Sequence, residues 1–176
     1  MGMGVLGTDA ARKLKALGFN VLGWSKTHEG HRRRRKLSTA DGLDEFLGRT
    51  DILVGLLPLT AETRDLYDMT LFRKLRRSGA LGGPFFVNAG RGGSQVEADL
   101  ATALTDGTLK GASLDVFQSE PLSADAPFWS MPNVILTPHC AANSDPAALF
   151  AYVERQIDRF ENGQPLENIV GREAGY

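Results

Sequence analysis

The sequence has one cysteine, no long apolar run and almost no net charge, and each absence excludes a class of protein. Cys140 alone cannot build an internal disulfide framework, which fits a reducing cytoplasm. No apolar run reaches the roughly 18 residues that a membrane span needs, and no signal-peptide pattern opens the chain. Its 20 basic and 21 acidic residues leave a net charge of −1, without global attraction to nucleic acid or anionic membranes. We therefore expect a cytoplasmic protein with no nucleic-acid or membrane partner.

Short apolar runs alternate along the chain with segments of helical periodicity, a pattern typical of an α/β fold. With 176 residues, the chain can bury one sizeable core, so we predict a single domain over residues 1–176. The predicted strands are Val21–Trp24, Asp51–Leu57, Pro84–Val87, Gly111–Leu114 and Val134–Leu136. The predicted helices are Thr8–Leu17, Asp41–Leu47, Thr70–Arg76, Glu97–Leu104 and Asp145–Phe160. The fold class is a Rossmann-type, doubly wound parallel sheet with helices.

Three glycines open the chain in the pattern Gly2-x-Gly4-x-x-Gly7, directly before the first predicted helix. Such glycines allow a tight turn and let backbone N–H groups approach a pyrophosphate at the helix N-terminus. The pattern is common by chance, but the helix and strand that follow strengthen it. In this fold the glycines follow a central strand, and only Met1 precedes Gly2. We expect a gap, a distorted sheet edge, or replacement of that strand by another segment.

Ser25, Lys26 and Thr27 stand about 18 residues after Gly7, where an acidic residue would hold the ribose hydroxyls of NAD. Two hydroxyls and an ammonium would instead receive a 2′-phosphate, which favours NADPH over NADH. A polar loop after a strand remains the alternative. The basic run His31–Lys36 is unusual. It fits a solvated loop best, additional contact with the 2′-phosphate next, and nucleic-acid binding least.

Polar residues follow three of the predicted strands, in Asn88–Gly92, Leu114–Pro121 and Thr137–His139. Loops that follow the strands of a parallel sheet gather along one edge, where ligands bind. An arginine, carboxylates and a histidine would therefore meet in one cleft, which suits an anionic substrate and acid–base chemistry. A surface arginine, a structural histidine and turn carboxylates are the alternative readings.

These motifs, in this order, resemble the nucleotide-binding half of the D-2-hydroxyacid dehydrogenases, and the NADPH-dependent glyoxylate/hydroxypyruvate reductases most closely. The resemblance runs from Gly2 to Tyr176. It implies hydride transfer from NADPH to a small 2-oxoacid and a homodimeric assembly. It also implies that Arg91 binds the substrate carboxylate and polarises the ketone, and that His139 donates a proton to the carbonyl oxygen. Glu120 would hydrogen-bond the far ring nitrogen, which fixes the tautomer and favours the imidazolium.

The resemblance also implies the cofactor contacts. They are Gly2, Gly4, Val5, Leu6, Gly7, Ser25, Lys26, Thr27, Leu57, Pro58, Thr63, Ala89, Asp115 and Ala141. Leu57 and Pro58 would cover the adenine ring, although a mere strand exit explains them equally well. Asp115 would orient the nicotinamide amide or support the site from behind, and no metal is implied. Gly90 stands where the family often has alanine, so we expect a tolerated and looser loop.

In the family a substrate domain precedes this half, so we expect an N-terminally truncated chain that lacks it. The helix and tail over residues 144–176 would pack on that domain. Without the domain, water would reach the nicotinamide, and we expect poor turnover by this chain alone. Two other readings stay open: a catalytically silent dinucleotide-binding sensor or scaffold, and an inactive truncated fragment. Finally, we expect Trp129 to be a structural anchor.

Overall fold

A computed structural model describes residues 1–25, 36–37, 40–142 and 145–171. The chain divides into two compact units, Met1–His139 and Cys140–Tyr176, which we describe separately. Two of the predicted cofactor residues, Lys26 and Thr27, and most of the basic run lie outside the described residues.

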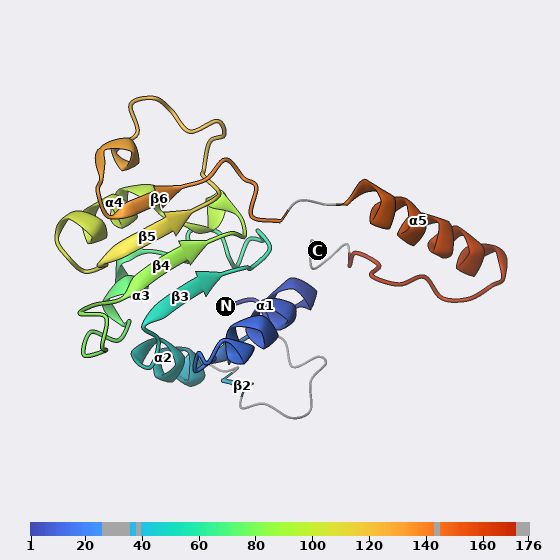
Figure 1. The fold of residues 1–176 in the computed structure, drawn as a ribbon, viewed down its shortest axis with the longest axis horizontal. Coiled ribbons are helices and arrows are strands. Elements are labelled where there is room, and N and C mark those ends of the chain that lie inside the picture. The colour runs from blue at the N-terminus through green and yellow to red at the C-terminus, as the bar shows by residue number, and fades with distance from the viewer. Residues whose placement is uncertain (26–35, 38–39, 143–144, 172–176) are drawn as a thin grey trace. The chain divides into compact units, whose positions relative to one another are not determined.

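The first unit is built on a parallel four-stranded sheet. Its strands are β3 (Ile52–Gly55), β4 (Phe85–Asn88), β5 (Gly111–Leu114) and β6 (Val134–Leu136), side by side in this order (Figure 1). A separate parallel pair joins β1 (Gly23–Trp24) to β2 (Lys36–Leu37). This parallel arrangement confirms the α/β fold class expected from the alternating pattern.

The helices lie where the periodicity predicts them, with ends that differ by a few residues. They are α1 (Val5–Ala16), α2 (Ala40–Gly48), α3 (Met69–Arg73), α4 (Glu97–Thr105) and α5 (Pro146–Glu161), with 3-10 turns η1 (Gly92–Ser94) and η2 (Pro127–Ser130). Asp68 starts α3 by accepting a 2.7 Å hydrogen bond from the Leu71 N–H. By contrast, α1 starts after Gly4 without a side-chain cap, so its first N–H groups need other acceptors.

The core lies against the middle of the sheet. Phe86 of β4 is fully buried, and its ring centroid lies 4.9 Å from that of Tyr67 and 5.2 Å from that of Phe72. Leu71 and Leu75 are buried beside Phe72, as the helical pattern predicts. The expectation for Trp129 was wrong: its side chain is 58% exposed, whereas its neighbour Phe128 is 2% exposed and provides the anchor.

Met1 and Gly2 lie between the two sheets, in the place of the expected central strand. The Leu56 N–H donates to the Met1 carbonyl over 3.1 Å, and the Gly2 N–H donates to the Trp24 carbonyl over 3.1 Å. The Met1 amine donates to the Val54 carbonyl over 2.6 Å, and its burial lowers its pKa to about 5. Of the three outcomes expected here, the described residues show a gap: the strands form two separate sheets, and Met1 and Gly2 bond to both of them.

The second unit consists of α5 and the tail that follows it. The tail folds back on the polar side of the helix: the Arg159 Nε donates to the Pro165 carbonyl over 2.9 Å, and the Glu167 N–H donates to the Gln156 side-chain oxygen over 2.8 Å. The apolar stripe of the helix is exposed at every position, Leu149, Phe150, Val153, Ile157 and Phe160. Packing of this stripe on a substrate domain stays a prediction.

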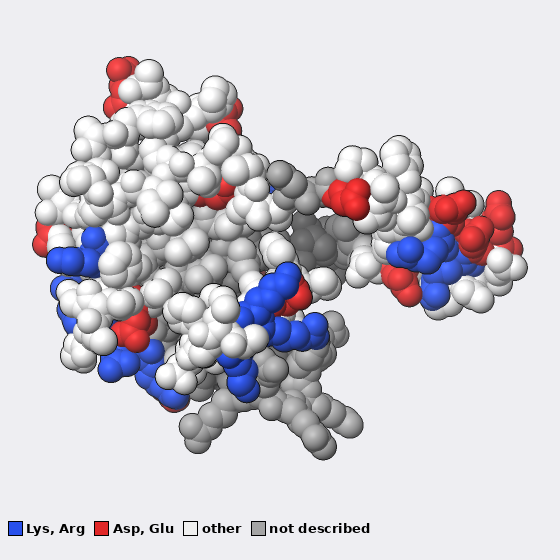
Figure 2. All heavy atoms as spheres, viewed as in Figure 1, with Lys and Arg blue, Asp and Glu red and all other residues white. Residues whose placement is uncertain are grey.

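Charges on the first unit are partly neutralised by ion pairs. Figure 2 shows Lys and Arg atoms beside Asp and Glu atoms on the face in view. Lys74 pairs with Asp44 at 2.7 Å and Arg49 with Glu45 at 3.0 Å, and each pair is largely exposed. Among the described residues, every helix is too short or too polar to cross a lipid bilayer.

Candidate active site

Three loops leave the carboxyl ends of β4, β5 and β6 at the same edge of the sheet. The first carries Arg91, the second Asp115 and Glu120, and the third His139. Hydrogen bonds of the ladder continue into these loops: the Asp115 N–H donates to the Asn88 carbonyl over 3.0 Å, and the Thr137 N–H donates to the Leu114 carbonyl over 3.0 Å. The loops that carry these four residues therefore lie at one edge of the sheet, and their meeting in one cleft stays a prediction.

His139 and Glu120 form a hydrogen-bonded pair, with 2.8 Å between Nδ1 and Oε2. The other carboxylate oxygen of Glu120 accepts the Phe117 N–H over 2.9 Å. The hydrogen bond from His139, and next that from Phe117, lower the pKa of the Glu120 carboxyl below its usual value. An ionised carboxylate only accepts hydrogen bonds, so Nδ1 carries a proton and Nε2 remains for other chemistry. The two side chains are 50% and 37% exposed, so solvent reaches the pair.

The backbone of His139 lies in the left-handed region, with φ of 52°. Residues other than glycine adopt this conformation at an energetic cost, which concentrates at functional sites. The turn after β6 therefore sets the direction of the imidazole through an uncommon backbone conformation. Nothing in Thr-Pro-His itself indicated this.

Arg91 is exposed, and its loop is held by one buried side chain. Asn88 donates from Nδ2 to the Arg91 carbonyl over 3.2 Å and accepts the Gly90 N–H on Oδ1 over 3.0 Å. Among the described residues, the Arg91 guanidinium makes one hydrogen bond, of 2.7 Å, to the Gly90 carbonyl. Because a guanidinium has five N–H donors, most of them stay available for an anionic ligand.

Gly90 also corrects the expectation of a looser loop. A Cβ at this position would lie 2.9 Å from the Leu57 carbonyl oxygen, so the loop packs closely on the backbone that follows β3. Together with the Asn88 hydrogen bonds, this contact fixes the loop rather than loosening it.

Asp115 is buried, 5% exposed, and its Oδ1 accepts a 2.6 Å hydrogen bond from the Thr137 hydroxyl. The contact joins the residue after β5 to the residue after β6. Of the two roles expected for Asp115, this is the supporting one. Its contact with a nicotinamide stays a prediction.

The three opening glycines have different surroundings. Gly2 has φ of +86°, and a Cβ there would lie 2.6 Å from the Leu56 carbonyl oxygen. A Cβ on Gly7 would overlap the Gly2 carbonyl oxygen, whereas one on Gly4 would meet no atom of the described residues within 4 Å, its own neighbours in the chain aside. Gly2 and Gly7 are thus required by packing, while Gly4 borders open space at the uncapped start of α1. Val5 and Leu6 lie exposed in its first turn.

The other predicted cofactor residues are spread over several segments. Ser25 follows β1 and is partly exposed, Leu57 is buried, and Ala89 is half-buried in the Arg91 loop. The Thr63 hydroxyl donates to the Pro58 carbonyl over 2.6 Å and accepts the Thr60 N–H over 2.8 Å, so it holds its own turn. Ala141 belongs to the second unit and is described apart from this edge.

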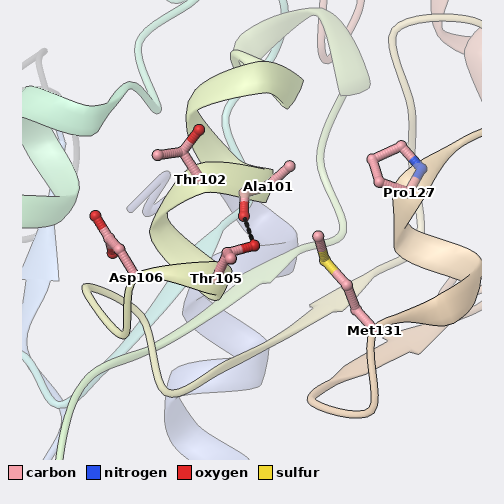
Figure 3. Close-up of a pocket in the computed structure, with 6 residues that line it drawn as sticks. All are labelled: Ala101, Thr102, Thr105, Asp106, Pro127 and Met131. Atoms are coloured by element: carbon pink, nitrogen blue, oxygen red, sulfur yellow. Dashed lines mark hydrogen bonds between the residues drawn. The ribbon is translucent and has the colours of Figure 1, made fainter.

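Two surface hollows lie away from the predicted residues. One, of about 330 Å³, is lined by Ala101, Thr102, Thr105, Asp106, Pro127 and Met131 (Figure 3). The Thr105 hydroxyl donates to the Ala101 carbonyl over 2.8 Å, within the helix. The other hollow, of about 310 Å³, lies over residues of α2, α3 and the segment between β3 and α3. Neither is lined by Arg91, Glu120 or His139.

A buried network of two side-chain amides near this edge was not predicted from the sequence. Asn88 and Gln95, both 0% exposed, share a 2.9 Å hydrogen bond from Nδ2 of Asn88 to Oε1 of Gln95. For Asn88, the sequence signal was its position as a polar residue at the end of an apolar strand. Gln95 lies in a polar context that carried no signal.

A glycine-rich turn before a helix, a parallel sheet, and an arginine with a histidine–carboxylate pair on its carboxyl edge define a nucleotide-binding dehydrogenase domain. Residues 1–141 match the family described as D-isomer specific 2-hydroxyacid dehydrogenase, NAD binding domain, and the chain belongs to this family.

Relatives with more specific names share the whole length of this chain. Glyoxylate/hydroxypyruvate reductase A from Escherichia fergusonii is 40% identical over 176 residues, 100% of this chain and 55% of that protein. The NADPH-dependent glyoxylate/hydroxypyruvate reductase from Sinorhizobium meliloti, solved with NADP and sulfate, is 60% identical with a TM-score of 0.94, over 100% of this chain and 55% of that one. A probable 2-hydroxyacid dehydrogenase from Rhizobium etli CFN 42, solved with NADP, HEPES and L(+)-tartaric acid, is 57% identical with a TM-score of 0.93 over the same shares. The chain therefore spans about half the length of these relatives.

Proposed function

We propose that this chain is the nucleotide-binding half of a reductase that transfers hydride from NADPH to a small 2-oxoacid of the glyoxylate or hydroxypyruvate type, giving the 2-hydroxyacid. The observation that carries the proposal is the His139–Glu120 hydrogen bond of 2.8 Å at the edge that also carries the exposed Arg91. The names of the Escherichia fergusonii and Sinorhizobium meliloti relatives support the substrate class.

In this proposal each side chain has one task. Bound NADPH supplies the hydride for the carbonyl carbon. Arg91 binds the substrate carboxylate through its unused donors and polarises the ketone. His139 gives a proton to the carbonyl oxygen and accepts it back in the reverse direction. Glu120 holds the Nδ1 proton of His139, so Nε2 is the nitrogen that exchanges a proton with substrate.

The start of α1 is suited to a dinucleotide. Open space beside Gly4 and the uncapped first turn of α1 offer backbone N–H groups to a pyrophosphate. Ser25, with Lys26 and Thr27 after it, would receive the 2′-phosphate of NADPH, and NADH would bind less well. We assign cofactor contacts in the same way to Val5, Leu6, Leu57, Pro58, Thr63, Ala89, Asp115 and Ala141. Two relatives solved with NADP support this assignment.

We further propose a homodimer in the cytoplasm. The exposed stripe of α5 offers apolar surface that association would cover, and the single cysteine suits a reducing compartment. Analytical ultracentrifugation at several protein concentrations tests the dimer. A single monomeric species throughout would contradict it.

Two experiments test the function. In the first, calorimetry compares NADPH and NADH binding to this chain and to Ser25→Asp. We expect the parent to prefer NADPH and Ser25→Asp to shift toward NADH, because its carboxylate repels a 2′-phosphate. An unchanged preference would refute the assignment of Ser25.

In the second experiment, this chain replaces the corresponding half of the Sinorhizobium meliloti reductase, and NADPH oxidation is followed with glyoxylate and hydroxypyruvate. We expect turnover that His139→Ala abolishes while NADPH binding remains. A chimera that binds NADPH but reduces no small 2-oxoacid would contradict the proposal. That result would favour a dinucleotide-binding sensor or scaffold.

A further inference from the structure

Gln95 is a fully buried amide between two loops of the candidate active site. Its side-chain oxygen accepts a hydrogen bond from Asn88 Nδ2 over 2.9 Å, and its Nε2 donates to the Val116 carbonyl over 3.0 Å. Asn88 in turn holds the carbonyl of Arg91 over 3.2 Å. One continuous path of hydrogen bonds therefore runs from the Arg91 loop to the segment after β5.

The backbone of Gln95 adds a second link to the same segment. Its carbonyl accepts a 2.7 Å hydrogen bond from Gln118 Nε2, and the Gln118 N–H donates to Glu97 Oε1 over 2.8 Å. Between the two points held by Gln95 lies Phe117, whose N–H donates to Glu120 Oε1. Gln95 thus holds the turn on both sides of the N–H that orients Glu120.

The two loops are also packed directly on each other. A Cβ on Gly92 would overlap the backbone carbonyl of Phe117, so the residue after Arg91 touches the turn that carries Glu120. With the backbones in contact here, a shift of either loop displaces the other. The hydrogen bonds of Gln95 and the contact at Gly92 fix the same spacing.

We propose that Gln95 is a positioning residue that sets the separation between Arg91 and the Glu120–His139 pair. It does not touch substrate in this reading. The position requires an amide, because one end must accept from Asn88 and the other must donate to the Val116 carbonyl. A carboxylate lacks the donor, and an apolar side chain leaves two buried polar groups unsatisfied.

The proposal predicts an effect on Glu120 that a purely structural role would not produce. The groups that face this carboxylate are His139 and the Phe117 N–H, which lower its pKa, and Asp115, which raises it. Gln95→Met removes the hydrogen bond to the Val116 carbonyl and keeps the one that the Gln95 backbone accepts from Gln118. The turn is then held on one side only, so the Phe117 N–H no longer points steadily at Glu120. We therefore expect the Glu120 titration midpoint to rise toward its usual value, as measured by carbon-13 NMR of the carboxyl in this chain.

Two further variants keep the test decisive. Asn133→Ala is the matched control, since Asn133 Nδ2 bridges the Leu104 and Lys110 carbonyls over 3.2 and 3.4 Å, before β6 rather than after it. It should lower stability and leave the Glu120 midpoint unchanged. Gln118→Met removes only the part-buried hydrogen bond from Gln118 Nε2 to the Gln95 carbonyl and should raise the midpoint less than Gln95→Met does. This variant keeps the test informative if Gln95→Met fails to fold. The proposal would be overturned if the Glu120 titration midpoint is unchanged in both Gln95→Met and Gln118→Met. It would also be overturned if Asn133→Ala shifts this midpoint as much as Gln95→Met does.

The kinetic consequence rests on the proposed function and is measured separately. In the chimera, Gln95→Met should lower kcat/KM for the 2-oxoacid roughly tenfold to a hundredfold, because both side chains that meet the substrate are displaced. NADPH affinity should stay unchanged. An inactive parent chimera would refute the reductase and leave the NMR result standing. An active parent whose kcat/KM is unaffected by Gln95→Met would overturn the positioning role instead.

Discussion

The Thr137 hydroxyl donates a 2.6 Å hydrogen bond to Asp115, and so joins the ends of β5 and β6 beside the Glu120–His139 pair. Thr137→Val keeps the shape of the side chain and removes this donor from a buried carboxylate. We expect the free energy of unfolding to fall by about 1–3 kcal/mol, because a buried carboxylate loses one of its hydrogen bonds. Thr137→Ser keeps the hydroxyl and should lose much less in urea denaturation. Equal losses for the two variants would assign the effect to packing of the methyl group.

Gly92 and Gly93 are neighbours in sequence with opposite tolerance for a side chain. A Cβ on Gly92 would overlap the backbone of Phe117, whereas a Cβ on Gly93 would lie 2.9 Å from Cδ2, at the far end of the Leu59 side chain. Gly92→Ala should therefore cost about 3 kcal/mol, and Gly93→Ala less than about 1 kcal/mol. Thermal unfolding followed by circular dichroism compares them, each being the other's control. A Gly92→Ala protein as stable as the parent would contradict the contact between the loops.

Gly55 makes room for a buried hydroxyl. A Cβ there would lie 2.7 Å from the Tyr67 hydroxyl oxygen, which has no hydrogen-bond partner among the described residues. We expect Tyr67→Phe to be neutral or to stabilise the fold by about 1 kcal/mol, because it removes an unpaired buried group. Gly55→Ala should destabilise by roughly 1–3 kcal/mol, and less in the Tyr67→Phe background. Additive effects in this double-mutant cycle would argue against the clash.

The pH dependence of the Glu120–His139 pair follows from the lowered pKa of Glu120. Between that lowered value and the usual one near 4.5, the unfolded chain binds more protons than the folded chain, so stability rises with pH. The contribution of the pair is thus fully present above about pH 4.5, and it is lost as the pH falls through the lowered value. The hydrogen bonds that Glu120 accepts from His139 and Phe117 therefore set the pH below which the pair no longer stabilises the fold.

His139→Gly tests this relation without adding backbone strain, since glycine adopts the left-handed conformation of residue 139 freely. We expect the Glu120 midpoint to rise, though incompletely, because the Phe117 N–H still donates to it. Lys13→Met is the control: it removes the 2.7 Å ion pair that lowers the pKa of Asp9 and should leave Glu120 unchanged. If His139→Gly leaves the Glu120 midpoint where it is in the parent, the hydrogen bond is not formed in solution.

Much of this architecture could be predicted, because it depends on local pattern and on the topology of a parallel sheet. The apolar runs around Leu53, Phe86 and Leu114 are buried strands, and their order brings Arg91 and His139 to one edge. That inference needs no knowledge of individual contacts.

The parts that could not be predicted depend on contacts between segments far apart in sequence. Gln95 meets the Val116 carbonyl 21 positions away, and no local pattern encodes that distance. Phe128 and Trp129 are adjacent aromatic residues, and the phase of one 3-10 turn decides which is buried. The Thr63 hydroxyl lies between the Pro58 carbonyl and the Thr60 N–H, a turn contact that was not predicted.

Substitutions at Gly4 and Gly7 should affect different properties, NADPH binding at Gly4 and stability at Gly7. Gly4→Ala adds a methyl group where none of the described residues beyond its chain neighbours has an atom within 4 Å, so it should leave the melting temperature within about a degree of the parent. The same methyl group enters the space proposed for the pyrophosphate and should weaken NADPH binding roughly tenfold or more. Gly7→Ala would instead drive a methyl group into the Gly2 carbonyl and should lower stability before it affects binding. Calorimetry measures the NADPH affinity of both variants, and thermal unfolding measures their melting temperatures. If Gly4→Ala binds NADPH as tightly as the parent does, the pyrophosphate does not bind at the start of α1.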